Sequence, residues 1–159
     1  MADLEICVER TIQASQQRVW DVVADIPSSA DTIESITKVD MLTDAPVGVG
    51  TRWKETRLMC RRETTEEMEV TAFEPPLRYV VEAESCGAHF TSEIRCEPIG
   101  DDVTRLSMTM RTRPLNLFAR LMKPLAKLAL KSTCKMLARD FDDIARAATG
   151  GGEAEPCPE

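Results

Sequence analysis

The sequence contains a single histidine, His89, and its six cysteines never form a C-x-x-C pair. Zinc sites and dithiol redox sites both need closely spaced cysteine or histidine ligands, so neither kind of site is predicted. Glycine-rich nucleotide-binding patterns, the H-E-x-x-H motif and the G-x-S-x-G motif are also missing. We therefore expect no metal ion and no cofactor.

Long apolar runs are missing as well. No stretch reaches the roughly 18 apolar residues that a membrane-spanning helix needs. The first residues, Met-Ala-Asp-Leu-Glu, have neither the basic start nor the apolar stretch of a secretory signal peptide. These features predict a cytoplasmic protein with reduced thiols, some of them packed as small apolar side chains.

Acidic residues are missing from one long segment. Residues 103–139 contain nine of the 20 basic residues and none of the 27 acidic ones. The net charge of −7 argues against general nucleic-acid binding, because neutralising phosphates needs a basic surface. Intervals of four predict a basic face on a helix, formed by Lys123, Lys127, Lys131, Lys135 and Arg139. This face is either a solvated surface or a weak contact site for an anionic membrane or an acidic protein.

Alternating apolar and polar residues predict a strand at residues 4–12. Ser15 is placed as the N-cap of a short helix that Pro27 ends, and residues 28–33 can add a second short turn. Turn residues separate six further predicted strands, at 35–41, 51–59, 63–73, 78–85, 89–97 and 103–112. The pattern predicts a meander of antiparallel hairpins.

Apolar residues at helical spacing predict a long amphipathic helix over residues 115–148. Pro124 lies inside this range and predicts a short helix before it and a long helix after it. Residues 149–159 are expected to form a disordered tail. We predict one domain over residues 1–148, of the α+β class, with a seven-stranded antiparallel sheet around the C-terminal helix and two short helices after the first strand.

Three motifs carry a resemblance to a known family. Residues 19–25 are similar to its first-helix pattern, residues 47–53 to its glycine turn before the third strand, and residues 73–79 to its turn between strands four and five. With the order of elements, they make residues 3–147 resemble the START-like superfamily, also called SRPBCC or polyketide cyclase/dehydrase-like. The resemblance implies a helix-grip fold with an apolar cavity for lipids, polyketides, hormones or quinones. It transfers no catalytic residue to this chain.

The strand at 51–59 carries the most suggestive polar residues. Alternation places Trp53, Glu55 and Arg57 on one face, and all three face inward if Trp53 does. Opposite charges on a cavity wall need each other or a ligand, because an isolated charge in an apolar site is unfavourable. Either Arg57 holds a ligand carboxylate, or Glu55 and Arg57 form a structural ion pair. In a third alternative, a β-bulge changes the register of the strand, so that both charged side chains face solvent.

Tyr79 is predicted to bring a hydroxyl to the same cavity, with core packing against a backbone or water partner as the alternative. Methionines on inward faces favour a pocket of variable shape, although each could simply fill the core. The predicted ligand-binding residues are Trp53, Glu55, Arg57, Met68, Tyr79, Phe90, Met108, Met110, Phe118 and Met122. No catalytic residue is predicted, and His89 is expected to face solvent or the cavity mouth.

Three functions are compatible with these residues. The first is binding, with or without transport, of a hydrophobic or amphipathic small molecule such as a lipid, polyketide or quinone. The second is a polyketide cyclase or dehydratase-type reaction in which Glu55 acts with Tyr79 or Arg57. The third is a protein-interaction module that uses the basic face and takes no small ligand. Both a monomer and a homodimer are compatible with the sequence.

Overall fold

The computed structural model describes residues 4–44, 46–59 and 61–151, which form a seven-stranded antiparallel sheet with a long C-terminal helix. The strands are β1 (Leu4–Ile12), β2 (Ile36–Met41), β3 (Arg52–Met59), β4 (Arg62–Glu74), β5 (Arg78–Ser85), β6 (Ala88–Gly100) and β7 (Val103–Pro114). Their order in the sheet is β1-β7-β6-β5-β4-β3-β2. Strands β2 to β7 therefore pair with their neighbours along the chain, and the predicted meander is confirmed.

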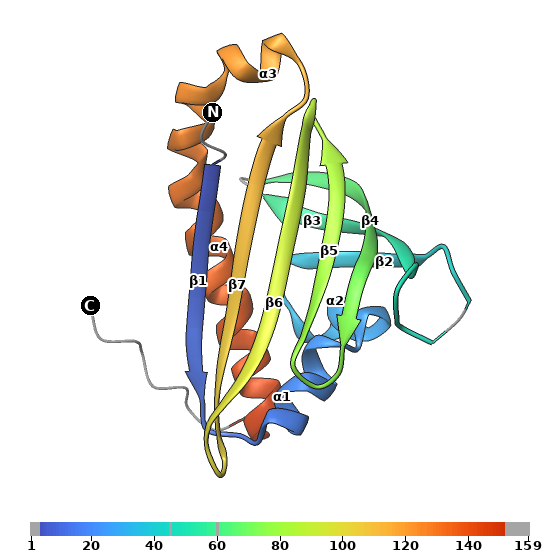
Figure 1. Ribbon diagram of the computed structural model, residues 1–159, viewed down its shortest axis with the longest axis vertical. Coiled ribbons are helices and arrows are strands. Elements are labelled where there is room, and N and C mark those ends of the chain that lie inside the picture. Colours follow the sequence, from blue (N-terminus) through green and yellow to red (C-terminus); the bar gives the residue numbers. More distant parts are fainter. Residues whose placement is uncertain (1–3, 45, 60, 152–159) are drawn as a thin grey trace.

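The sheet is strongly twisted around the helix α4 (Lys123–Thr149). In Figure 1, β2 and β3 run at a steep angle to β1 and β7. Alternation along each strand decides which side chains face the helix: in β1, Ile6 and Ile12 are buried, whereas Glu5 and Glu9 are exposed. This is the helix-grip arrangement that the sequence predicted.

The connection from β1 to β2 forms one wall of the site described below. Its elements are α1 (Gln16–Val23), the 3-10 turn η1 (Ile26–Ser28) and α2 (Ser29–Thr32). Ser15 is the N-cap of α1, and its hydroxyl accepts a hydrogen bond from the Arg18 amide at 3.4 Å. Pro27 lies in the first turn of η1, so α1 ends before it as predicted.

The C-terminal helical region is divided at Met122. The short helix α3 (Leu117–Leu121) precedes it, and α4 follows with Pro124 in its first turn, where the missing amide hydrogen has no consequence. Gly150 ends α4 in the left-handed conformation, with φ 73°. The predicted division at the proline is confirmed, and residues 152–159 of the expected tail lie outside the described residues.

Helix α3 begins two residues later than the predicted helix. Asn116 has an extended cap conformation, and its side-chain oxygen accepts a hydrogen bond from the Ala119 amide at 2.8 Å. Leu115 meanwhile donates its amide to the Gly87 carbonyl at 2.8 Å. Within the described residues, no helix is long and apolar enough to cross a membrane.

Candidate ligand-binding site

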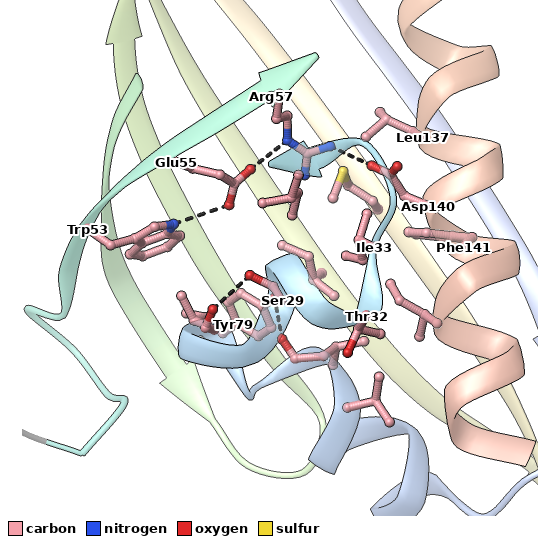
Figure 2. A pocket seen from close by; sticks show the side chains of 17 residues that line it. Ser29, Thr32, Ile33, Trp53, Glu55, Arg57, Tyr79, Leu137, Asp140 and Phe141 are labelled. Carbon is pink, nitrogen blue, oxygen red and sulfur yellow. Dashed lines mark hydrogen bonds and ion pairs between the residues drawn. The ribbon is translucent and has the colours of Figure 1, made fainter. Parts of the chain in front are cut away.

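A cavity of about 80 Å³ lies between the sheet, the α1–α2 connection and the second half of α4 (Figure 2). Most of its wall is apolar, formed by Val22, Val23, Ile26, Ile33, Ile36, Trp53, Ile94, Met108, Leu137, Phe141 and Ile144. The polar lining residues are Ser29, Thr32, Glu55, Arg57, Tyr79 and Asp140. The cavity is thus an apolar space with a few polar groups on its wall.

Strand β3 supplies one side of this wall. Trp53 and Glu55 are 3% and 6% exposed, so the face that carries them does point inward. The Trp53 indole nitrogen donates a hydrogen bond to Glu55 Oε2 at 3.2 Å, and Arg57 Nε donates to Glu55 Oε1 at 2.5 Å. Both oxygens of the buried carboxylate therefore have a partner from the same strand.

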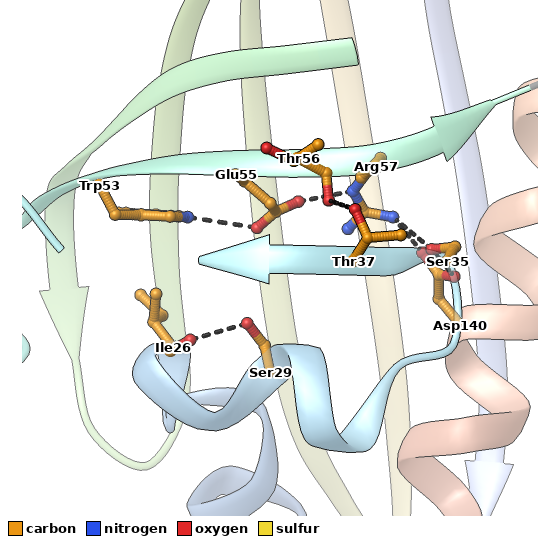
Figure 3. A network of polar contacts seen from close by, with 9 residues as sticks. All are labelled: Ile26, Ser29, Ser35, Thr37, Trp53, Glu55, Thr56, Arg57 and Asp140. Atoms are coloured by element: carbon orange, nitrogen blue, oxygen red, sulfur yellow. Dashed lines mark hydrogen bonds and ion pairs between the residues drawn. The ribbon is translucent and has the colours of Figure 1, made fainter. Parts of the chain in front are cut away.

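Helix α4 supplies the second carboxylate (Figure 3). Arg57 Nη1 donates to Asp140 Oδ2 at 2.5 Å and to Ser35 Oγ at 3.0 Å, while Ser35 Oγ donates to Asp140 Oδ1 at 2.6 Å. The side chain of Asp140 is 4% exposed and that of Arg57 is 18% exposed. We call these five residues, Ser35, Trp53, Glu55, Arg57 and Asp140, the Arg57 network.

The Arg57 network is held together by charge. Burial alone would lower the pKa of the Arg57 guanidinium, but the carboxylates of Glu55 and Asp140 outweigh this effect and raise the pKa above its ordinary value. Among the described residues, the only buried side-chain polar atom without a hydrogen-bond partner is Arg10 Nε. The network is therefore complete without a ligand, and it joins β3 to α4.

Tyr79 reaches the cavity from β5 and is 8% exposed. Its hydroxyl donates a hydrogen bond to the Val23 carbonyl at 2.9 Å, and its ring packs edge-on against Trp20 with 5.9 Å between centroids. Burial raises the pKa of the phenol above its usual range, with smaller contributions from Cys96 and Glu55. Tyr79 is therefore a neutral phenol whose proton is donated to Val23, and its oxygen lone pairs remain to accept a hydrogen bond from a ligand.

A second, more open space lies on the outer side of the network. This groove has a volume of about 460 Å³ and runs between the end of β3 and α4. Leu58, Met59 and Met136 give it apolar surface, and the remainder is lined by polar and charged residues of α4 and by Glu34 and Ser35. Asp140 lines both the groove and the inner cavity, so the Arg57–Asp140 ion pair stands between them.

This fold and cavity can be compared with known proteins. A model of the family described as polyketide cyclase/dehydrase and lipid transport matches residues 4–148. The chain belongs to this family. No curated protein matches the sequence.

Several solved structures share the fold of this polyketide cyclase/dehydrase family member. Protein TTHA0849 from Thermus thermophilus has a TM-score of 0.75 at 16% identity, with 94% of this chain and 100% of that chain covered. The Zhui aromatase/cyclase from Streptomyces sp. R1128 has a TM-score of 0.72 at 16% identity, over 95% and 99% of the two chains. A START superfamily protein from Mycobacterium smegmatis has a TM-score of 0.64 at 14% identity, over 86% and 95%. The predicted START-like resemblance is confirmed.

The structure brings part of the predicted ligand-binding set to this START-like cavity. Trp53, Glu55, Arg57, Tyr79 and Met108 line it. Three further predicted residues, Met68, Phe90 and Met110, are partly buried on the sheet but do not line it. Phe90 pairs with Thr112, near the end of β7 that leads into α3, so it lies too far along the sheet.

Phe118 and Met122 were predicted to face the cavity, and the structure places them elsewhere. Phe118 is 71% exposed and Met122 is 38% exposed, both outside the cavity lining. The prediction assumed that the whole C-terminal helical region covers the sheet. Instead, α3 lies at one end of the molecule, beside the end of β7 (Figure 1).

The sequence reasoning missed Ser35 and Asp140, which complete the network. A signal for Asp140 was present, because it lies three residues after Leu137 and four before Ile144, on the face of α4 that is buried. An acidic residue on an apolar helix face needs a partner, and the inward-facing Arg57 was available. No comparable pattern marks Ser35, which lies in the turn before β2.

Other candidate chemistry lies outside the cavity. Among the residues that the structure describes, no group of three or more His, Cys, Asp or Glu side chains could hold a metal ion. The His89 ring nitrogens lie 3.2 Å from a Glu82 carboxylate oxygen and 3.4 Å from a Glu84 carboxylate oxygen. His89 does not line the cavity.

Proposed function

We propose that the protein binds a hydrophobic or amphipathic small molecule, such as a lipid, a polyketide or a quinone, between the sheet and α4. One observation carries the proposal: a mostly apolar cavity with a charged network on one side. Ligand pockets commonly have this composition, in which the apolar wall provides affinity and a few polar groups orient the ligand. The family description, which includes lipid transport, agrees with this function.

The Arg57 network favours ligand groups that donate hydrogen bonds. Arg57 already has Glu55 and Asp140 as partners, and two carboxylates face one guanidinium. An anionic ligand group would be repelled by this arrangement, whereas a hydroxyl or phenol can donate to a carboxylate oxygen. We therefore expect an apolar ligand with a neutral donor group, in place of the carboxylate that Arg57 alone had suggested.

Binding of such a ligand requires the cavity to enlarge. Its volume of about 80 Å³ is well below the roughly 300–1,000 Å³ of ordinary small-molecule pockets. The outer groove adds about 460 Å³ on the other side of the Arg57–Asp140 pair. Separation of α4 from β3 at this pair would join the two spaces and admit a ligand from the groove.

Native mass spectrometry of the protein purified from its own host tests the proposal. We expect a stoichiometric noncovalent adduct, which organic extraction then identifies. If none is found, the protein is incubated with a mixed panel of lipids, polyketides and quinones. A bare protein mass after both steps would contradict the proposal.

The two tryptophans allow a sharper test, because only Trp53 lines the cavity. In Trp20→Phe, Trp53 remains as the sole fluorescent tryptophan, and we expect its emission to shift when a ligand binds. In Trp53→Phe, the remaining Trp20 packs against Phe73 in the core and should respond much less. Equal responses of the two variants would place the ligand elsewhere.

A polyketide cyclase or dehydratase-type reaction is the alternative function. The observation that favours it is the burial of the Glu55 carboxylate at the cavity wall, where an acid or base could reach a bound chain. Glu55→Gln should then abolish turnover of a bound polyketide chain while ligand binding persists. The matched control is Glu67→Gln, on an exposed position of β4, which should keep full activity.

A further inference from the structure

Five large apolar side chains cluster at the end of the molecule formed by α3 and the start of α4 (Figure 1). We call them the apolar tip: Leu117, Phe118, Leu121, Leu125 and Leu128. They are 60–78% exposed. Within α3, Leu117 and Phe118 lie four and three residues before Leu121, and within α4, Leu125 lies three residues before Leu128, so each helix has an apolar face. A folded domain rarely exposes so many large apolar side chains together unless they contact something.

The apolar tip has no role within the described fold. None of its residues belongs to the hydrophobic core, lines the inner cavity or lines the outer groove. The core-facing residues of α4 begin at Leu137, more than two turns after Leu128. The tip therefore offers its apolar surface to a partner outside the molecule.

Basic residues adjoin the apolar tip. Lys127 and Lys131 are exposed on α4, and Lys131 lies one turn beyond Leu128. Among the described residues, neither lysine has an ion-pair partner, and the same holds for Lys135. The side chain of Lys123 lies outside the described part of the chain. The segment that includes the tip and both lysines, residues 103–139, contains no acidic residue, in a molecule with net charge −7.

We propose that the apolar tip inserts into the interfacial layer of an anionic lipid bilayer. Leucine and phenylalanine side chains enter the boundary between headgroups and acyl chains, while lysines bind the anionic headgroups around them. A protruding end suits a bilayer, which deforms around it, whereas a protein partner would need a matching apolar hollow with an acidic rim. The acidic remainder of the molecule is repelled by the same headgroups, which orients the protein with its tip towards the membrane.

Cosedimentation with vesicles tests this inference independently of the proposed ligand. We expect the protein to bind vesicles of phosphatidylcholine with phosphatidylserine and to bind pure phosphatidylcholine much more weakly. Leu121→Ser combined with Leu125→Ser should lower the affinity roughly tenfold or more, because apolar area no longer leaves water. Lys127→Gln combined with Lys131→Gln should lower it about fivefold per charge.

Matched controls use exposed residues outside the tip. Val49 is 70% exposed and Lys54 is exposed on β3, so Val49→Ser and Lys54→Gln should bind vesicles as the wild type does. All substituted positions are exposed, and circular dichroism should show unchanged folding. The inference is overturned if the wild type ignores anionic vesicles, if the leucine variant binds undiminished, or if the controls lose as much affinity. A wild-type dimer that the leucine variant dissociates, without vesicle binding, would instead make the tip an interface between copies.

Discussion

Arg57 forms ion pairs with two buried carboxylates at once, so its removal leaves both without a cationic partner. We expect Arg57→Met to lower the free energy of unfolding by about 3 kcal/mol, the size typical for removing one partner of a buried pair. Urea unfolding followed by circular dichroism measures the loss. Replacing all three charges, with Glu55→Gln and Asp140→Asn added, should restore much of the stability, because no buried charge is then left unpaired.

Arg52 is the matched control for this substitution, since it lies on the same strand and also has an acidic partner. Its side chain is 50% exposed and that of its partner Glu67 is 42% exposed. Solvent screens such a pair, so Arg52→Met should change the free energy of unfolding by less than about 1 kcal/mol. Equal losses in the two arginine variants would mean that burial adds nothing to the Arg57 pairs.

Cys96 predicts a loss of stability at alkaline pH. Burial raises the pKa of its thiol to about 12, whereas an unfolded cysteine titrates near ~8.5. Above the unfolded pKa the folded state holds a proton that the unfolded state has lost, so stability falls as pH rises towards 12. Cys96→Ala should reduce this slope of unfolding free energy against pH.

The two halves of α4 differ in environment, and stability should follow that difference. Leu137 is 6% exposed and packs beside the cavity, whereas Leu128 on the same helix is 75% exposed. We expect Leu137→Ala to lower the free energy of unfolding by about 3 kcal/mol, as large-to-small core substitutions do. Leu128→Ala should change it by less than about 0.5 kcal/mol. Thermal or urea unfolding of both variants measures this, and comparable losses would show that the first half of α4 is packed in solution.

The strands were predictable because their signals are local. Alternation of side chains in β1 and turn residues between the hairpins specify each strand without reference to the remainder of the fold. The helix break at Pro124 was predictable for the same reason, since proline acts on its own turn. Strands and helix ends that are determined by neighbouring residues could thus be predicted from the sequence.

The site was only partly predictable because it joins distant residues. Alternation placed Glu55 and Arg57 on the inward face of β3, but Asp140, the second acidic partner of Arg57, is 83 positions away from it. Periodicity also predicted one apolar side over the whole C-terminal helical region, residues 115–148. It could not show where the sheet beneath that side ends, so Phe118 was expected inside and is exposed. Tertiary distances of this kind are set by the sheet, not by local sequence.

At the scale of the whole molecule, α4 connects three features. The apolar tip lies at its start, and the outer groove, lined from Ser132 to Arg146, and the inner cavity, lined from Leu137 to Ile144, both lie along its second half. From Leu125 to Leu137 the helix rises about 18 Å, at 1.5 Å per residue. If both the proposed ligand and the proposed membrane contact hold, a ligand leaving the bilayer at the tip can reach the cavity along the groove.

This arrangement predicts that the apolar tip controls the rate of ligand transfer and leaves ligand affinity unchanged. With a fluorescent apolar probe that quenches Trp53, the Leu121→Ser, Leu125→Ser variant should bind as tightly as the wild type, because neither leucine lines the cavity. Its transfer of the probe to phosphatidylserine-containing vesicles should be about tenfold slower, as fewer molecules dock. Asp140→Asn acts where the groove adjoins the cavity and should change probe affinity with and without vesicles. Equal transfer rates for the wild type and the leucine variant would mean that the ligand crosses free solvent, so that docking and ligand binding serve separate purposes.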